Sequence, residues 1–509
     1  MEGVLRRLTR AGRLLEGDFR PGGLHREWCD PKVLGNIRRR SLARVRHQAA
    51  PVDPHVLARL TTVWQGTTRP RPGLDALLDA IEHLQGAPVP ASILERQVLP
   101  ARVEGYEPGQ LDTLMAAGEV AWAGVEPLGD RDGRIALFLA DHFRRLWRGR
   151  PAGDALPSRE RAIVEALASA GASFFPALHE AAGGGYPGET LDALGNLAWR
   201  GLVTNDSLHA VRAFVRPPGR ERRSRPGLGF RSRRTTPPSA EGRWELVASR
   251  IGRPPSDTEW SAAVAQQLLN RYGIVTREIA SAESLPGGFA GAYTVFRTME
   301  ERGRIRRGFF VSGVAATQFA LPPALDLLRS LRQEPEEPEV VRLAATDPAN
   351  PYGALLPWPE PDTSSMGGGR GPTRSVGASV VLVNGRLACY VGRHGRQVLS
   401  YLPADEPDRG RTGRAVATVL ADLAARHEGR DGGLLVSEVN GAPVGSHPVA
   451  EFLRLAGFVA SAQGLLYPRR PLVGLPVLES DGSKRPSSRK TRTLLSSPWA
   501  ALRRGEGET

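Results

Sequence analysis

The most informative stretch of the sequence reads AAVAQQLLNRYG at 262–273, VTREIASAE at 275–283, FAGAYTVFRTMEERG at 289–303, IRRGFF at 305–310 and ATQFAL at 316–321. Apolar residues recur at helical spacing in the first three segments, and short runs of strand-forming residues follow in the last two. Three helices followed by a hairpin is the order of a winged helix. The stretch from Trp260 to Phe319 is therefore predicted to fold as one.

The same order occurs twice more. Between Gly73 and Ala140, helices are expected over 74–85, 91–103 and 108–118, followed by strands over 119–125 and 135–140. Between Ser158 and Val215, helices are expected over 159–171, 174–182 and 188–201, followed by a strand over 202–205. The sequence thus predicts tandem winged helices.

The N-terminus matches the end of such a unit. GRLLEGDF at 12–19 aligns with GRIRRGFF at 303–310, which leads from the third helix into the wing. Leu5 and Leu8 would then belong to a third helix whose two supporting helices are absent. We expect either a fragment of a longer product or a partner polypeptide that supplies the missing part.

The amino-acid composition indicates the class of partner and excludes some kinds of binding site. The chain has 509 residues and a formal charge of +14, and its basic residues are 65 arginines and 3 lysines. This charge favours an acidic partner such as nucleic acid, although a bias of the coding sequence would also raise arginine. No lysine follows a glycine, so a phosphate-binding loop of the Walker type is not expected. Only Cys29 and Cys389 are present, too few for a four-cysteine metal site.

The C-terminal third differs from the repeats. Asn384-Gly385 between alternating apolar runs predicts a type I′ hairpin within a small antiparallel sheet or barrel. No apolar run is long enough for a membrane span, so a soluble, cytoplasmic and nucleoid-associated protein is expected. The predicted class is α+β, with tandem winged helices before a small β-barrel or α+β module. The predicted divisions are a winged-helix remnant (1–24), a helical connector (25–72), winged helices (73–150 and 151–215), an arginine- and proline-rich linker (216–243), a winged helix (244–332), a linker with the DPANPYG loop (333–375), the β-barrel or α+β module (376–468) and a basic, disordered tail (469–509).

Several longer strings resemble the C-terminal region of the large helicase-related (Lhr) proteins. They are REWCDPKVLGNIRRRSLARVR at 26–46, LQGAPVPASILERQVLPARV at 84–103, QLLNRYGIVTRE at 267–278, AATDPANPYGALLPWP at 344–359 and EVNGAPV at 438–444. The resemblance extends to about Pro468. It implies tandem winged helices and a β-barrel similar to winged-helix glycosylases that remove alkylated or crosslinked bases. Family members are ATP-dependent nucleic-acid helicases, and uracil-DNA glycosylase activity has been attributed to this region in some of them.

The candidate nucleic-acid contacts are arginines at the end of the third helix and in its wing, namely Arg297, Arg302, Arg304, Arg306 and Arg307. Guanidinium groups there would bind phosphates. A solvated basic face is the alternative. Arg131 and Arg134 at the earlier hairpin alternate with Asp130 and Asp132, so that wing is expected to be nearly neutral. Trp199 is expected in the core.

Asp347 is the tentative catalytic residue. A monofunctional glycosylase needs a carboxylate beside a flipped base, and Asp347 shares a loop with Asn350 and Tyr352, which could contact a base edge. Asp before Pro is also a common turn residue, and that alternative is preferred. Lys32 is the only lysine outside the tail, which disfavours lyase chemistry through an amine.

Three functions are compared. The first is a DNA-binding, repair-linked region of a large helicase-related protein that lacks the ATPase motor and acts with a helicase core encoded elsewhere or lost. The alternative is an autonomous monofunctional DNA glycosylase acting on uracil, alkylated or crosslinked bases. A transcription regulator would fit the winged helices but not the strings. The expected partner is DNA, with RNA, an RNA:DNA hybrid, a helicase core in trans and a homo-oligomer left open. No membrane partner, metal or other cofactor is expected.

Overall fold

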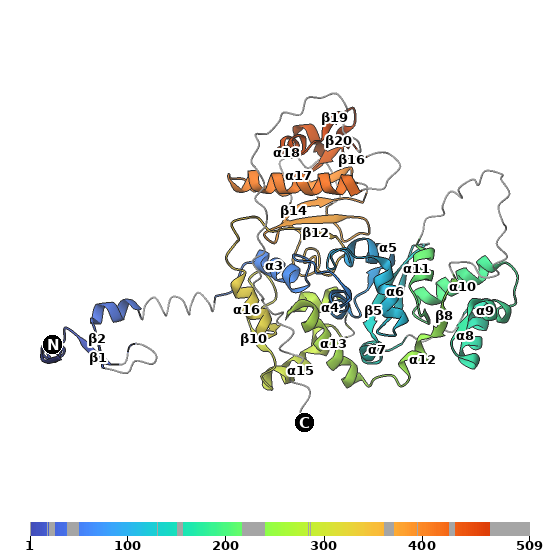
Figure 1. Cartoon of the computed structure of the whole chain (residues 1–509), viewed down its shortest axis with the longest axis horizontal. Coiled ribbons are helices and arrows are strands. Elements are labelled where there is room, and N and C mark those ends of the chain that lie inside the picture. Colours follow the sequence, from blue (N-terminus) through green and yellow to red (C-terminus); the bar gives the residue numbers. More distant parts are fainter. Residues whose placement is uncertain are drawn as a thin grey trace.

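A computed structural model describes residues 2–17, 19, 26–37, 50–129, 131–149, 156–215, 240–283, 285, 287–360, 371–393, 395–426 and 433–468. Winged-helix units form the lower part of Figure 1, and a sheet covered by a long helix forms the upper part. The linker core at 216–239 and the tail from 469 lie outside the described residues, so the expectations for them stand as predictions. No helix in these ranges is long and apolar enough to cross a membrane.

The first complete unit is preceded by α3 (Pro54–Trp64), whose apolar residues pack with those of the third unit. The helices of the first unit itself include α4 (Leu74–Leu84) and α6 (Pro108–Ala116), and its sheet has the order β3-β5-β4. The strands are β3 (Val89–Pro90), β4 (Val120–Leu128) and β5 (Asp132–Leu139). The helix expected over 91–103 is interrupted: α5 (Ala91–Ile93) passes into a π-helix at Leu94–Val98.

The second unit extends beyond its predicted end. It contains α8 (Ser158–Ala170), α9 (Phe175–Ala181), α10 (Pro187–Trp199), α11 (His209–Phe214) and strands β6 (Ser173–Phe174), β7 (Val203–Asn205) and β8 (Arg243–Leu246). Strand β8 pairs with both β6 and β7, and its Trp244 is fully buried. Residues 243–246, assigned to the boundary and the next unit, therefore complete this sheet.

The third unit, over 257–330, follows the predicted order. It contains α13 (Asp257–Tyr272), β9 (Ile274–Val275), α14 (Arg277–Ala282), α15 (Gly288–Glu301), β10 (Arg306–Gly308), β11 (Gln318–Ala320) and α16 (Pro322–Ser330). A capping box between Ser256 and Glu259 starts α13, because each side chain satisfies a backbone N–H at the helix end. The wing is the antiparallel pair β10–β11, and β9 pairs with β11 on the side away from β10.

Each third helix ends in the same way. Gly12, Gly118, Gly201 and Gly303 have φ between 70° and 79°. Each donates its N–H to the carbonyl three residues earlier, and the next residue donates to the carbonyl five residues earlier. This Schellman pattern needs a left-handed residue, which glycine provides without a steric penalty. The N-terminal helix α1 (Glu2–Arg10) and its hairpin β1 (Leu15–Gly17) and β2 (Glu27–Cys29) share this backbone geometry with α15 and its wing.

The C-terminal module is an open sheet covered by helices. Its main sheet has the order β12-β13-β14-β15-β17-β18, formed by Val340–Ala344, Ser379–Val383, Arg386–Val391, Gln397–Ser400, Glu438–Val439 and Ala442–Pro443. Among the described residues this sheet does not close, so the barrel alternative is wrong and the α+β alternative is confirmed. The hairpin prediction is also confirmed, since Asn384 and Gly385 have φ of 50° and 77° between β13 and β14.

A second, smaller layer completes this module. Helix α17 (Asp408–Arg426) packs on the main sheet, and α18 (Val449–Leu455) packs on α17. The small sheet has the order β16-β20-β19, formed by Gly433–Val436, Gly464–Pro468 and Val459–Ser461. Figure 1 shows α17 between the two sheets.

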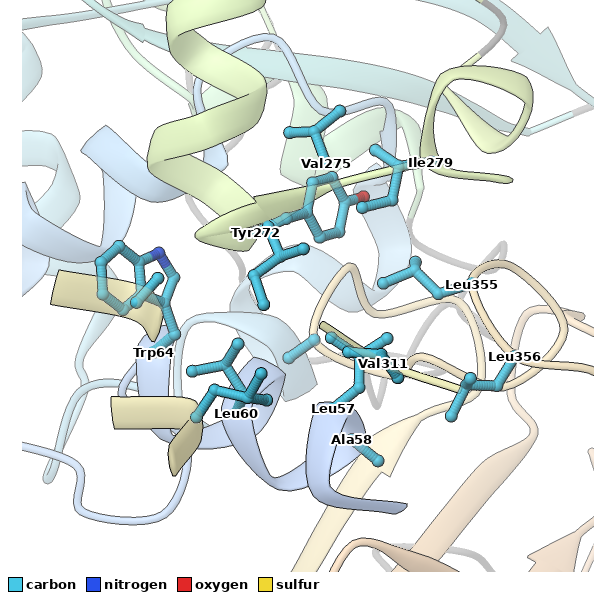
Figure 2. Close-up of a cluster of buried hydrophobic side chains, with 14 of the residues drawn as sticks. Leu57, Ala58, Leu60, Trp64, Tyr272, Val275, Ile279, Val311, Leu355 and Leu356 are labelled. Carbon is cyan, nitrogen blue, oxygen red and sulfur yellow. The ribbon is translucent and has the colours of Figure 1, made fainter. Parts of the chain in front are cut away.

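One apolar core joins the third unit to the C-terminal sheet through α3. Figure 2 shows Leu57, Leu60 and Trp64 of α3 near Tyr272 and Val275 of the third unit. The same cluster includes Leu343 of β12 and Leu355 and Leu356 of the loop that follows. Residues 341–356 of the predicted linker are therefore packed into this core.

Polar side chains of α13 attach it to the end of α4. Gln267 Nε2 donates to the carbonyls of Glu82 and His83 over 2.8 and 3.2 Å, and buried Arg271 donates to the carbonyls of His83 and Gln85. The His83 ring lies in this interface, with Nδ1 2.9 Å from the carbonyl oxygen of Asp79. Burial lowers the pKa of His83 from 6.5 to about 4.

This histidine should make folding pH-dependent. Between about pH 6.5 and 4 the unfolded chain binds a proton at His83 that the folded protein excludes, so stability falls on acidification. The loss attributable to His83 should be about 2 kcal/mol from pH 7.5 to pH 5. Urea unfolding of His83→Gln should show a correspondingly smaller pH dependence than the parent, while the exposed His209→Gln should match the parent. An unchanged pH dependence in His83→Gln would contradict this assignment.

Candidate nucleic-acid interface

In winged helices the third helix and the wing are the usual DNA contacts, so the first question is which of these elements remain accessible. In the second unit, α10 is used for packing. Its seven buried residues include Trp199, which is 6% exposed and lies in the core as expected. A Cβ on Gly124 would lie 1.8 Å from the Ala198 carbonyl oxygen, and one on Gly133 would lie 2.3 Å from the Trp199 ring. Helix α10 thus covers the wing of the first unit.

Helix α6 of the first unit is accessible but carries the wrong charge. Its sequence PGQLDTLMA contains no basic residue. Asp112 pairs with Arg212 at 2.8 Å, and the residue after the capping glycine is Glu119. At the nearby wing Arg134 pairs with Glu126 at 2.9 Å. This surface therefore does not attract phosphate.

Helix α15 presents a different surface. Only Ala292 and Phe296 of its residues are buried. The structure places the predicted contacts at the end of this helix and on the adjoining strand β10, all with exposed side chains: Arg297, Arg302, Arg304, Arg306 and Arg307. Figure 1 shows α15 and β10 at the lower edge of the molecule.

The five arginines differ in how they are held. Arg297 pairs with Glu301 at 2.9 Å, and Arg307 pairs with Glu300 at 3.2 Å. The side chains of Arg302, Arg304 and Arg306 form no hydrogen bond or ion pair with another described residue. Three guanidinium groups thus remain available for an anionic ligand, and the two glutamates limit the net positive charge.

The shared helix ends reveal a feature that the sequence reading missed. Counting from the capping glycine, the residues six before and one after it are Arg297 and Arg304 in α15, and Arg6 and Arg13 at α1. The same positions hold Asp112 and Glu119 at α6, and Gly195 and Leu202 at α10. The alignment of 12–19 with 303–310 already contained this signal, and the glycines expected at the ends of α6 and α10 extend the comparison to those helices.

The tentative catalytic residue Asp347 is located elsewhere, in the loop after β12. Its side chain is fully buried and forms a bidentate ion pair with Arg102, with nitrogen–oxygen distances of 2.7 and 3.0 Å. The Ala349 N–H donates to the same carboxylate over 2.7 Å. Arg102 also donates to Gln65 Oε1 and to the Val98 carbonyl. This geometry favours a structural turn residue, and it leaves the carboxylate no exposed surface for a base.

The two residues that were expected to contact a base edge also point inward. The Asn350 amide donates to the Ala345 carbonyl over 2.9 Å and accepts from the Tyr352 N–H over 3.1 Å. The Tyr352 hydroxyl donates to the Gly385 carbonyl over 2.8 Å, and burial raises its pKa to about 12. Asn350 therefore fixes the loop internally, and Tyr352 attaches it to the hairpin.

A cleft of about 400 Å³ lies between α4 and the strand ends of the first unit, and it is acidic. Its lining includes Asp79, Glu82, Glu119 and Asp141. Such a lining repels nucleic acid. No group of acidic, histidine or cysteine side chains suited to a metal ion occurs within the described ranges.

The sequence and structure were compared with known proteins. Residues 52–140 and 254–340 match the models of two winged-helix domains of large helicase-related proteins. The chain is 40% identical over 460 residues to "Lhr helicase/ probable uracil glycosylase" of Mycolicibacterium smegmatis, covering 87% of this chain and 29% of that protein. It is 35% identical over 476 residues to "Lhr helicase/uracil glycosylase" of Escherichia coli, covering 86% and 30%.

Among solved structures, the Streptomyces sahachiroi DNA glycosylase AlkZ aligns with a TM-score of 0.45 and 16% identity, over 77% of this chain and all of its own. The chain spans less than a third of the length of the two helicase relatives. Two segments of the chain thus match winged-helix domains of the large helicase-related family, and most of its length aligns with two proteins of that family.

Proposed function

We propose that this chain binds DNA through α15 and β10, as a repair-linked region of a large helicase-related protein. One observation carries the proposal: α15 is a third helix that is both exposed and followed by arginines without a protein partner. Helix α10 is buried against a wing, and α6 carries acidic residues. We therefore choose α15 and β10 as the binding surface because α15 is the third helix that is both accessible and followed by basic side chains.

The chemistry of this surface suits the phosphate backbone. Arg302, Arg304 and Arg306 can each contact a phosphate and displace its counterions, which makes the affinity salt-dependent. They lie at the helix end and on the wing, so they are not aligned as a set that reads consecutive bases. Binding with little sequence preference follows from this placement.

DNA binding alone does not account for the activity of the full-length relatives. Their names include a helicase, and this chain contains no Gly-Lys-Ser/Thr sequence with which to bind ATP as P-loop motors do. We propose that DNA bound by this region is acted on by a helicase core supplied in trans or by another part of a larger protein.

The first test is the salt dependence of duplex binding. The affinity should fall steeply between about 50 and 200 mM salt. Arg304→Gln with Arg306→Gln should reduce the slope of log K against log salt by about two, since each lost phosphate contact removes about 0.9. Fluorescence anisotropy at several salt concentrations measures the affinity for duplex DNA and, from it, the slope of log K against log salt.

The matched control is Arg134→Gln, which removes an exposed arginine from the neutral wing and should leave the slope unchanged. Equal slopes in all three proteins would place the contact elsewhere. A preference of about a thousand-fold for one short sequence would also contradict the proposal, because it requires specific base contacts.

A second candidate function is a monofunctional DNA glycosylase, favoured by the uracil glycosylase in the names of both relatives. The reaction would hydrolyse the bond between base and sugar and leave an intact abasic site. Lys32 is the only lysine before the tail, so no covalent amine intermediate is expected and borohydride should trap no adduct.

Asp347→Asn separates the catalytic role from the structural one. The substitution keeps the shape but leaves buried Arg102 without its counter-charge, so unfolding in urea should show a loss of about 3–5 kcal/mol. Replacing both residues, as Arg102→Met with Asp347→Leu, removes both buried charges and should recover most of that stability.

Base release from uracil-containing DNA is then compared in the two variants at a temperature where both are folded. We expect the double variant to retain whatever release the parent shows. Loss of release in a stable double variant would instead make Asp347 the catalytic acid.

A further inference from the structure

One aromatic side chain stands among the arginines of the wing. Phe309 follows β10 directly and is 47% exposed. Arg304, Arg306 and Arg307, all exposed, precede it within five residues. A single exposed apolar residue is ordinary, but an exposed aromatic ring beside several guanidinium groups is the combination that binds unpaired nucleic acid.

The backbone around Phe309 is fixed on both sides. Gly308 pairs with Gln318 in the wing, and the Gln318 side chain accepts hydrogen bonds from the N–H groups of Phe310 and Val311. The Phe310 carbonyl accepts from the Val52 N–H over 2.8 Å, which attaches the wing to the segment just before α3. The ring is thus held in the solvent by an ordered backbone, which lowers the entropy cost of binding.

Strand alternation places Phe309 on the same side of the wing as Arg307. Arg307 is itself oriented, because it pairs with Glu300 and donates to the Tyr293 hydroxyl over 3.3 Å. The ring therefore lies on the side of the wing that faces the end of α15, where the phosphate-binding arginines are located.

We propose that Phe309 stacks on an unpaired base, so that this surface prefers nucleic acid containing an unpaired base over continuous duplex. The proposal rests on the DNA binding proposed above and adds its specificity. In a continuous duplex each base face is covered by its neighbours, and an aromatic ring can reach only edges. An unpaired base exposes its face, and Arg302 and Arg304, at the end of α15, would hold the flanking phosphates.

The test compares three probes of one sequence: a single strand, a fully paired duplex, and that duplex with one unpaired 2-aminopurine. Phe309→Ala should weaken binding to the single strand and to the unpaired-base duplex by about 5- to 150-fold, the range found when a base-stacking aromatic is removed. Binding to the paired duplex should change by less than about two-fold. The 2-aminopurine fluorescence should be quenched by the parent and not by Phe309→Ala.

Two further variants separate stacking from other roles. Phe309→Trp should retain the preference, whereas Phe309→Leu, which is apolar but has no π face, should lose it. Phe174→Ala is the matched control, because Phe174 is 60% exposed on the second unit. It should leave every affinity unchanged.

The outcomes are distinct. Equal weakening on all probes, no weakening, or full rescue by leucine overturns the stacking proposal and leaves DNA binding through α15 intact. The stacking proposal is also overturned, and DNA binding through α15 again left intact, if the parent protein binds duplex in a salt-dependent way but shows no preference for the unpaired base. A parent protein that binds none of the probes overturns both proposals.

Discussion

The buried ion pair between Arg102 and Asp347 joins the first winged-helix unit to the C-terminal sheet. The two side chains are 1% and 0% exposed. Removing two charges from water is costly, and the cost is offset only when geometry and hydrogen bonding are complete. Here the pair is bidentate, and each partner has additional protein hydrogen bonds. The loop after β12 therefore has little freedom to shift relative to Arg102, because any displacement would leave a charge buried without its partner.

Helix α3 extends this connection to the third unit. It precedes the first unit in sequence, and it contributes Leu57 and Leu60 to a core shared with α13 and β12. Its other side receives the tip of the β13–β14 hairpin so closely that a Cβ on Gly385 would lie 2.2 Å from the His55 carbonyl oxygen. The wing after α15 is attached to the same region through Val52. The exposed arginines are thus presented by a well-packed support.

Sequence patterns predicted the parts that local chemistry determines. Asn384-Gly385 gave the hairpin, and capping glycines such as Gly303 gave the helix ends. The pairing of β8 was not predictable, because a four-residue strand that returns after a long arginine-rich segment has no local signal. The role of Asp347 was equally hidden, since its partner lies 245 residues away. At the candidate site the sequence pointed to the arginines, but their accessibility depends on which third helices the other units cover.

The units also show how one backbone motif acquires different uses. Helix α1 and the third helices α6, α10 and α15 all end on a left-handed glycine with the same hydrogen bonds, so the chain leaves each helix in the same direction. The side chains at fixed distances from that glycine then differ: arginines at α15, acidic residues at α6, and small or apolar residues at α10. Since the backbone is constant, the difference in surface must come from these side chains. The arginines make the end of α15 basic, and the absence of bulk and charge at these positions allows α10 to pack against a neighbouring wing.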